Sequence, residues 1–249
     1  MEDEKIFNRT EKKYVISRSE YNYLVKAIKN HMKKDGYYKS GIYNIYFDND
    51  NYDLIIQSID HPVFKQKLRA RSYRGYNKVF FEIKTKINRN YTDDSDENLG
   101  YKRRVLITKK DYADYIKNKA DFMTIVQRDS EQKTDIQIAK EIDYMIKHFD
   151  LKPKILVMYD RESYVGDDEL RVTFDTHLKY RTANLKFSKN SADKPYFNDK
   201  KCIIMEIKAK GYLPLWLVHA LSEKNIYPQR FSKIGNIYKK IRKEQDALQ

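Results

Sequence analysis

Cationic side chains recur at every second position in one short segment of the chain. Lys67, Arg69 and Arg71 alternate with Leu68 and Ala70. Because successive side chains of a β-strand point to opposite faces of the sheet, the three cations would share one face. Lysine and arginine can bind phosphate oxygens there, and a guanidinium does so through two parallel hydrogen bonds. This pattern favours the binding or transfer of phosphoryl groups.

The same alternation recurs in six further segments. Their charged members include Glu11, Lys13, Glu82, Lys84, Lys102, Arg104, Arg161, Arg171, Glu206 and Lys208. Single glutamates interrupt the cations, and Mg²⁺ or Mn²⁺ could bridge these carboxylates to phosphate oxygens. For Glu11 and Glu82 a buried ion pair with lysine is the alternative role, whereas Glu206 favours the metal.

The polar face of an antiparallel sheet usually meets water, which is the alternative explanation for each strand alone. Several amphipathic helices elsewhere in the chain need an apolar sheet face to cover. If they wrap the outside of a barrel, the charged faces must point inward, and a barrel of about eight strands can enclose a ligand. Two like charges about 7 Å apart repel by roughly 2 kcal/mol at an effective dielectric near 20, so we expect a phosphate chain to compensate the cations.

The composition agrees with a polyanionic partner. The 249 residues include 50 Lys and Arg against 36 Asp and Glu, a formal charge of +14. Nucleic acid, an anionic membrane surface or a phosphorylated ligand would fit this charge. Cys202 is the single cysteine, which excludes an intramolecular disulfide. No run approaches the roughly 20 apolar residues of a membrane span, and we expect a soluble, cytoplasmic protein.

The order of elements predicts one domain over residues 1–249. Alternation predicts strands over 9–16, 40–47, 64–73, 78–86, 101–107, 155–165, 169–180 and 202–209. Ser17 and Glu20 form a capping box for a helix ending near Lys34. Further helices are predicted within 109–150, over 214–224 and over 234–247, and residues 88–100 form an acidic loop. The fold class is therefore α+β: a closed antiparallel eight-stranded β-barrel with helices packed around the outside.

Eight motifs follow one another between Arg9 and about Tyr238. They are Arg9-Thr-Glu-Lys-Lys-Tyr, Lys67-Leu-Arg-Ala-Arg-Ser-Tyr, Phe81-Glu-Ile-Lys, Tyr101-Lys-Arg-Arg, Tyr159-Asp-Arg-Glu, Leu170-Arg-Val-Thr-Phe-Asp-Thr, Met205-Glu-Ile-Lys and Phe231-Ser-Lys-Ile. In this order they resemble the vacuolar transporter chaperone (VTC) domain. That family belongs to the triphosphate tunnel metalloenzymes, which also include the CYTH adenylate cyclases and thiamine triphosphatases.

The resemblance implies a polyphosphate polymerase, which transfers the γ-phosphate of ATP to a polyphosphate chain with Mn²⁺ or Mg²⁺ and releases ADP. It implies that Ser232 lies beside the tunnel, that Glu206 holds the metal, and that phosphates contact Lys13, Arg69, Arg71, Lys84, Lys102, Arg161, Arg171 and Lys233. We assign catalysis to Arg69, Arg71, Arg161, Arg171 and Lys233. The strand pattern adds Lys67, Arg104 and Lys208 as phosphate-binding residues, and Glu11 and Glu82 as further metal ligands.

One departure concerns the Glu-x-Glu-x-Lys start of the CYTH hydrolases, which is here Arg9-Thr-Glu11-Lys-Lys13. The missing glutamate favours the VTC branch. Eukaryotic relatives carry a phosphate-sensing helical domain and membrane helices. Two alternatives follow: polymerisation is uncoupled from transport, or it is coupled through a separate membrane partner, which would place the protein at the inner face of a membrane. A tripolyphosphatase or nucleoside triphosphatase remains an alternative, as does a non-catalytic polyphosphate- or nucleic-acid-binding module. Nucleic acid is the less favoured partner, because the tyrosines are spread over strands and helices alike.

Overall fold

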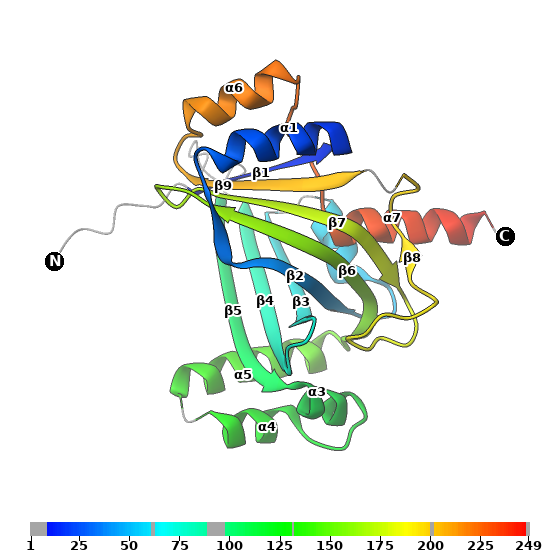
Figure 1. Ribbon diagram of the computed structural model, residues 1–249. Helices are drawn as coiled ribbons and strands as arrows, with labels where there is room; N and C mark the ends of the chain where they lie inside the picture. The colour runs from blue at the N-terminus through cyan, green and yellow to red at the C-terminus, as the bar shows by residue number, and fades with distance from the viewer. Residues whose placement is uncertain (1–8, 61–62, 89–97, 131, 200–201, 248–249) are drawn as a thin grey trace. The chain divides into compact units, whose positions relative to one another are not determined.

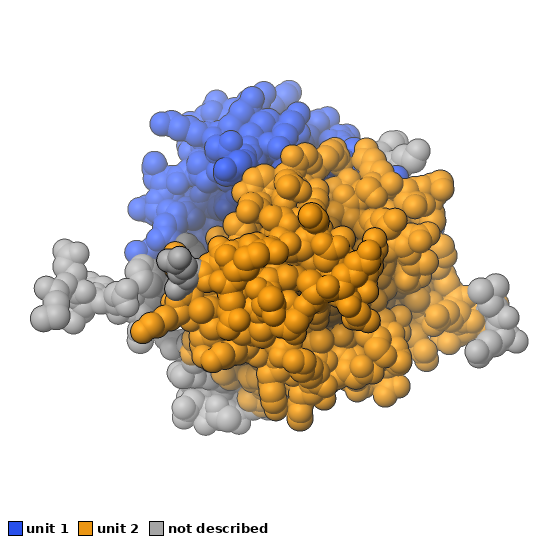
Figure 2. All heavy atoms as spheres, turned by 90° about the horizontal axis from the view of Figure 1, so that it is seen from below, with its two compact units in different colours: residues 1–41, 159–179, 195–232 blue, residues 42–158, 180–194, 233–249 orange. Residues whose placement is uncertain are grey.

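The computed structural model describes residues 9–60, 63–88, 98–130, 132–199 and 202–247. The polypeptide divides into two compact units (Figure 2). Unit 1 comprises residues 1–41, 159–179 and 195–232, and unit 2 comprises 42–158, 180–194 and 233–249. The long strands β2 (Lys33–Asp48) and β6 (Lys152–Val165) contribute to both units.

Unit 1 is an antiparallel sheet covered by helices α1 and α6 (Figure 1). Its strands follow the order β1-β9-β7-β6-β2. The remaining elements of this unit are β1 (Arg9–Ile16), β7 (Arg171–Arg181), β9 (Ile203–Lys210), α1 (Arg18–Lys29) and α6 (Leu215–Glu223). Tyr14, Met205 and Phe174 lie side by side in the ladders, and they pack against Leu24 of α1 in one buried cluster.

The start of α1 agrees with the sequence prediction and its end does not. Ser17 accepts from the backbone of Glu20, and the Glu20 side chain accepts from the backbone of Ser17, so the predicted capping box is confirmed. The helix ends at Lys29 rather than near Lys34. Strand β2 begins at Lys33, so Lys34, near which the helix was predicted to end, lies inside a strand.

Unit 2 continues β6 and β2 into three further antiparallel strands in the order β6-β2-β3-β4-β5. These strands are β3 (Phe64–Tyr73), β4 (Lys78–Asn88) and β5 (Asn98–Thr108). The helices are α2 (Asp53–Ile59), α3 (Lys109–Ile116), α4 (Phe122–Asp129), α5 (Lys133–His148) and α7 (Lys233–Asp246). A two-residue strand, β8 (Lys194–Pro195), pairs with β7.

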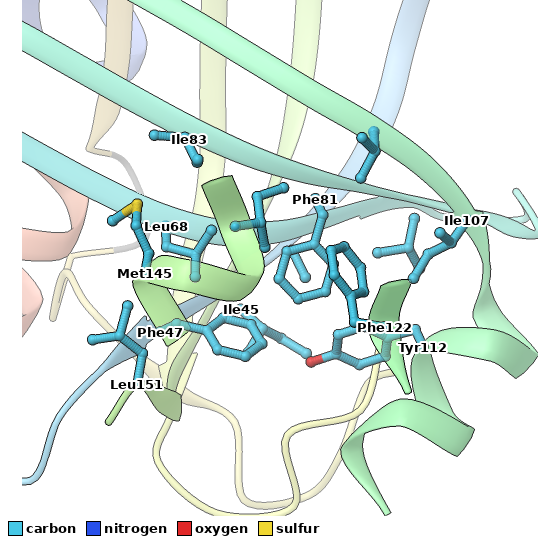
Figure 3. Packing of buried hydrophobic residues seen from close by; sticks show 14 of the residues in the cluster. Ile45, Phe47, Leu68, Phe81, Ile83, Ile107, Tyr112, Phe122, Met145 and Leu151 are labelled. Carbon is cyan, nitrogen blue, oxygen red and sulfur yellow. The ribbon is translucent and has the colours of Figure 1, made fainter. Parts of the chain in front are cut away.

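The core of unit 2 lies between one face of its sheet and the helices α3, α4 and α5. Leu68, Phe81 and Val105 point into this cluster from three neighbouring strands. The rings of Phe81 and Phe122 lie 5.1 Å apart between centroids (Figure 3). Burying each such side chain stabilises the fold by about 1.5–3 kcal/mol. The helices thus cover the apolar face of the sheet, and the charged side chains lie on the opposite face.

The α+β class, the antiparallel strands and the helical cover of the apolar faces are confirmed. The hydrogen-bonded strand order does not return on itself, because β1 and β5 stand at its two ends and no ladder joins them in the described residues. The expected closure of the barrel by hydrogen bonds is therefore not observed. The exposed side chains of Lys102, Arg103 and Arg104 discourage pairing of edge strand β5. Nor does the described chain contain a helix of the length and apolarity that crossing a membrane requires.

Candidate phosphate-binding faces

In unit 2, all seven predicted site residues of β3, β4 and β5 share the face opposite the helices. Two register rows cross these strands, Arg69–Glu82–Arg104 and Lys67–Lys84–Lys102. Arg71 lies one same-face step from Arg69 along β3. We call the set Lys67, Arg69, Arg71, Glu82, Lys84, Lys102 and Arg104 the basic face. The alternation in the sequence therefore placed these side chains correctly.

Glu82 lies at the centre of the basic face, with only 2% of its side chain exposed. Its carboxylate contacts Arg69 Nε at 2.7 Å, Lys102 Nζ at 2.8 Å and Arg71 Nε at 3.8 Å. Burial alone would raise the pKa of Glu82, but the three cations lower it to about 2. Because three cations already neutralise this carboxylate, the contacts fit the ion-pairing role better than the metal-binding role.

This low pKa makes the stability of the protein depend on Glu82 in acid. A carboxyl whose pKa falls from 4.5 to about 2 on folding contributes stability above pH 4.5, and loses it as the pH falls toward 2. We therefore expect Glu82→Gln to lower the free energy of unfolding at neutral pH, and the difference from wild type to shrink below pH 4.5. Denaturant unfolding of both proteins between pH 7 and pH 2 measures this. A constant difference across that range would contradict the assignment.

Arg71 is held by Asn44, a residue outside the predicted site. Its Nε donates to Asn44 Oδ1 at 2.8 Å, and Asn44 Nδ2 donates to the carbonyl of Val157 at 3.5 Å. Asn44 is 1% exposed and lies opposite Arg71 in the ladder between β2 and β3. A polar residue in a strand segment that is otherwise apolar was the signal that could have found it.

We expect Asn44→Ala to lower kcat/KM for phosphoryl transfer by about tenfold, a change of about 1.4 kcal/mol, because Arg71 loses the acceptor that fixes its plane. Ser72→Ala is the matched control. Ser72 is also fully buried, but its hydroxyl donates to the Lys78 carbonyl and its position on β3 belongs to the opposite face. Steady-state kinetics and thermal unfolding of both variants test this. Equal kinetic losses in the two would show that Asn44 acts only through stability.

The polar face of unit 1 carries anions and cations in comparable numbers. Two register rows cross β1, β9 and β7: Glu11–Lys208–Arg171 and Lys13–Glu206–Thr173. Glu11 contacts Lys13 at 3.2 Å and Lys208 at 3.4 Å, and Glu206 contacts Lys208 at 3.1 Å. We call the set Glu11, Lys13, Asp35, Arg161, Arg171, Asp175, Glu206 and Lys208 the mixed-charge face.

Arg161 of the mixed-charge face is locked by one buried carboxylate. Its Nε and Nη2 donate to the two oxygens of Asp175 at 2.6 and 2.8 Å. Asp175 has no exposed side-chain surface. Burial by itself would lower the pKa of Arg161. The nearby charge of Asp175 raises that pKa by more than burial lowers it, so the guanidinium stays protonated. The paired geometry fixes the plane of the group.

Arg171 is held by two side chains from neighbouring strands. Its Nε donates to Ser163 Oγ at 3.1 Å, and its Nη2 donates to Asp35 Oδ2 at 2.7 Å. Ser163 also donates to the same Asp35 oxygen at 3.0 Å. No sequence pattern indicated a role for Asp35, since the predicted first helix ended next to it.

The four arginines predicted for catalysis share one arrangement. In each, the Nε–H donates to a protein acceptor: Glu82 for Arg69, Asn44 for Arg71, Asp175 for Arg161 and Ser163 for Arg171. Fixing this edge restricts rotation of the guanidinium before any ligand arrives. Such pre-organisation lowers the entropy cost of binding an anion.

The metal-binding roles of Glu11 and Glu206 stay predictions. Their carboxylates flank the ammonium group of Lys208, and Glu11 also contacts Lys13. Thr173, opposite Glu206 in the ladder and 4% exposed, has a buried hydroxyl with no hydrogen-bond partner among the described atoms. Carboxylate and hydroxyl oxygens are ligands that Mg²⁺ and Mn²⁺ accept. No cluster of three His, Cys, Asp or Glu suited to a metal occurs within the described ranges.

Two predicted residues lie outside the strands. Lys233 is the first residue of α7 and Ser232 directly precedes it. Both side chains are half-buried. Their roles toward phosphate stay predictions.

Comparison with known proteins identifies the family. The VTC domain matches residues 8–241. A protein from Hippeastrum, described as a candidate adenylyl cyclase with a dominant triphosphatase activity, has a similar structure, with a TM-score of 0.51 and 15% identity over 89% of this chain and 90% of that one. A Pyrococcus horikoshii protein gives a TM-score of 0.45 and 12% identity over 93% and 99% of the two chains. The first likeness supports the fold, and the match over residues 8–241 shows that the chain belongs to the VTC domain family.

Proposed function

We propose that this chain is a metal-dependent polyphosphate polymerase, which transfers the γ-phosphate of ATP to an inorganic polyphosphate chain. Family membership supports the substrate class. The observation that carries the proposal is the set of four arginines whose Nε edges are bound by protein acceptors. Phosphoryl transfer depends on positioning and charge neutralisation more than on a protein nucleophile, and oriented guanidinium groups supply both.

The reaction needs no covalent intermediate on the protein. A terminal oxygen of the polyphosphate chain attacks the γ-phosphorus of ATP, and the bond from that phosphorus to the β–γ bridging oxygen breaks. ADP leaves with the bond's electron pair, and the chain is one phosphate longer. The phosphate oxygens change their charge during transfer, and four guanidinium groups bind them throughout: those of Arg69, Arg71, Arg161 and Arg171. Lys233 contributes a further positive charge to these oxygens.

The remaining candidate residues hold the two substrates. Binding of phosphate oxygens is assigned to Lys13, Lys67, Lys84, Lys102, Arg104, Lys208 and Ser232. Glu11 and Glu206 would hold Mn²⁺ or Mg²⁺, which supplies charge neutralisation to the phosphates when bound. Glu82 serves as the counter-charge that keeps Arg69 and Lys102 in place. A membrane partner and a location at the inner face of a membrane stay predictions.

Hydrolysis of a triphosphate is the second candidate function. The similar fold of the Hippeastrum protein, described as having a dominant triphosphatase activity, favours it. The same arginines would then bind the triphosphate while water replaces the chain end as the acceptor. Loss of a glutamate at Arg9 removes one carboxylate of the hydrolase pattern, which favours polymerisation.

The test is incubation of the purified chain with ATP and Mn²⁺, followed by gel electrophoresis of polyphosphate and quantification of ADP and free phosphate. Polymerisation predicts long chains and one ADP for each phosphate incorporated. Free phosphate in place of chains would show hydrolysis. No turnover of either kind would leave the protein a binder and would refute both enzymatic functions. A parallel reaction in EDTA controls for metal-independent contaminants.

A further inference from the structure

Helix α6 carries apolar residues on its outward side as well as on its buried side. Leu217, Ala220 and Leu221 are buried in the cluster that covers the unit 1 sheet. Leu215 and Val218 point away from that cluster and are 74% and 37% exposed. The outward side of a surface helix is ordinarily polar, and a helix that is apolar all round is ordinarily covered on all sides. The outward side of α6 therefore has the character of a contact surface.

The segment that leads into α6 extends this surface. Although 35% of all residues are charged, residues 211–222 contain no Lys, Arg, Asp or Glu. Tyr212 is 98% exposed, and Trp216, the single tryptophan of the chain, is half-buried. We call Tyr212, Leu215, Trp216 and Val218 the α6 patch. Single exposed apolar residues are ordinary, whereas a group of them marks a site of contact with a protein or a membrane.

Helix α1 lies beside α6 and runs antiparallel to it (Figure 1). The Tyr23 hydroxyl donates to Glu223 Oε2 at 2.6 Å. The ring of His31, two residues beyond the end of α1, is stacked on the ring of Trp216, with 4.4 Å between centroids. Tyr23 precedes His31 in the chain, whereas Glu223 follows Trp216, so the two contacts fix the antiparallel direction. The end of α1 therefore lies next to the α6 patch.

Positive charge borders the α6 patch. Lys26 and Lys29 are exposed in the last turn of α1. Lys224 directly follows α6, and its ammonium group lies over the ring of Tyr23 at 4.7 Å from the centroid. The carboxylate of Glu223 contacts this same ammonium group at 3.3 Å. A second copy of the chain would bring like charges against these lysines, whereas anionic lipid headgroups complement them.

We propose that the α6 patch docks on the surface of an anionic lipid bilayer. Its apolar side chains enter the boundary between headgroups and acyl chains, where the rings of tyrosine and tryptophan are favoured. Lys26, Lys29 and Lys224 meet the headgroups, so that apolar burial and electrostatic attraction act together. None of the residues predicted to bind phosphate or metal belongs to α1 or α6, so this inference stands apart from the proposed function.

Trp216 provides the test, because the emission of a single tryptophan reports on this surface alone. The full chain is mixed, at about 0.15 M salt, with vesicles of phosphatidylcholine with and without phosphatidylglycerol. With the anionic vesicles we expect emission to shift to shorter wavelength and brominated acyl chains to quench it. Sedimentation with these vesicles without a change in emission would show that another basic surface binds, and would overturn the proposal. Protein that sediments with neither kind of vesicle would also refute it and leave a protein as the occupant.

A pair of apolar variants tests the contribution of the patch. Leu215→Gln/Val218→Gln should weaken binding to the anionic vesicles at least about tenfold, because binding strength follows the apolar area that enters the bilayer. Ile56→Gln/Ile116→Gln is the matched control, since both isoleucines are 37% exposed and lie on helices of unit 2. Its affinity should stay within about twofold of wild type. Equal losses in the two variants would contradict the assignment.

A pair of charge variants tests the lysines of α1. Lys26→Ala/Lys29→Ala should weaken binding to the anionic vesicles at least about tenfold, because each lysine near the surface attracts the headgroups. Lys239→Ala/Lys243→Ala removes two positive charges from exposed positions of α7 and should weaken binding less than about threefold. Equal losses would show that net charge alone governs binding, and would refute the proposed surface. Circular dichroism of each variant verifies its fold.

Discussion

Arg69→Ala should abolish polyphosphate synthesis, with a fall in kcat of about a hundredfold to a thousandfold or more. Arg69 combines two properties on which transfer depends: a charge on the basic face, and a guanidinium fixed by Glu82 at 2.7 Å. Losing it removes an oriented donor from the developing charge. Arg69→Lys should recover only part of the rate, because an ammonium group cannot bind phosphate through two parallel hydrogen bonds.

Two variants separate this effect from instability. Arg69→Ala leaves the buried Glu82 with fewer partners, so the double variant Arg69→Ala/Glu82→Gln should regain stability without regaining activity. Arg103→Ala is the matched control, because Arg103 also pairs with a glutamate, Glu141, but from the opposite strand parity of β5. Thermal unfolding and the gel assay together decide the matter. A folded Arg69→Ala protein with full activity would refute the assignment of this face.

Arg171→Ala is expected to have an effect of similar size on turnover and a small effect on stability. Arg171 and Asp35 are partly exposed, with 48% and 20% of their side chains accessible, so breaking this pair leaves no fully buried charge. The rate should fall because the guanidinium oriented by Ser163 and Asp35 is missing. Measured kcat and KM for ATP, with the melting temperature, provide the test.

Arg18→Ala is the control for Arg171→Ala. Arg18 also belongs to unit 1 but is the first residue of α1, where its guanidinium lies over the ring of Tyr21 at 5.0 Å. It should keep wild-type turnover. If Arg171→Ala also kept wild-type turnover, the mixed-charge face would not be part of the site.

The sequence predicted the strand faces well because their pattern is local. The bounds 9–16 and 64–73 match β1 and β3. Within a strand, side chains two residues apart always share a face, so the sequence alone shows which residues lie together. The apolar residues at the intervening positions show which face the helices cover. The alternation placed Arg69, Glu82 and Lys102 on the charged faces of three strands, and the register between those strands brings the three together.

Helix α2 was missed because its start depends on a contact from outside the helix. Its preceding residue, Tyr52, makes no side-chain cap, and its φ of 62° lies in the left-handed region. Asp48, at the end of β2, instead accepts from the N–H groups of Leu54 and Ile55. Seven residues with an unusual start do not give a recognisable pattern.

The positioning residues of the site were missed for a similar reason. Asp35 and Ser163 are far apart in sequence, and only the pairing of strands brings both to Arg171. Asp175 lies within the motif Leu170-Arg-Val-Thr-Phe-Asp-Thr, but its contact with Arg161 depends on the pairing of strands. Residue types predict which groups can bind phosphate. The acceptors that orient those groups depend on register between strands.

The most direct test of the account follows the fate of the transferred phosphate. The protein is incubated with Mn²⁺ and ATP labelled either at the γ-phosphate or at the α-phosphate, and the products are resolved on a gel. We predict that γ-label enters long chains while α-label remains in ADP, and that Arg69→Ala incorporates neither. Release of the γ-label as free phosphate with no labelled chain would contradict polymerisation.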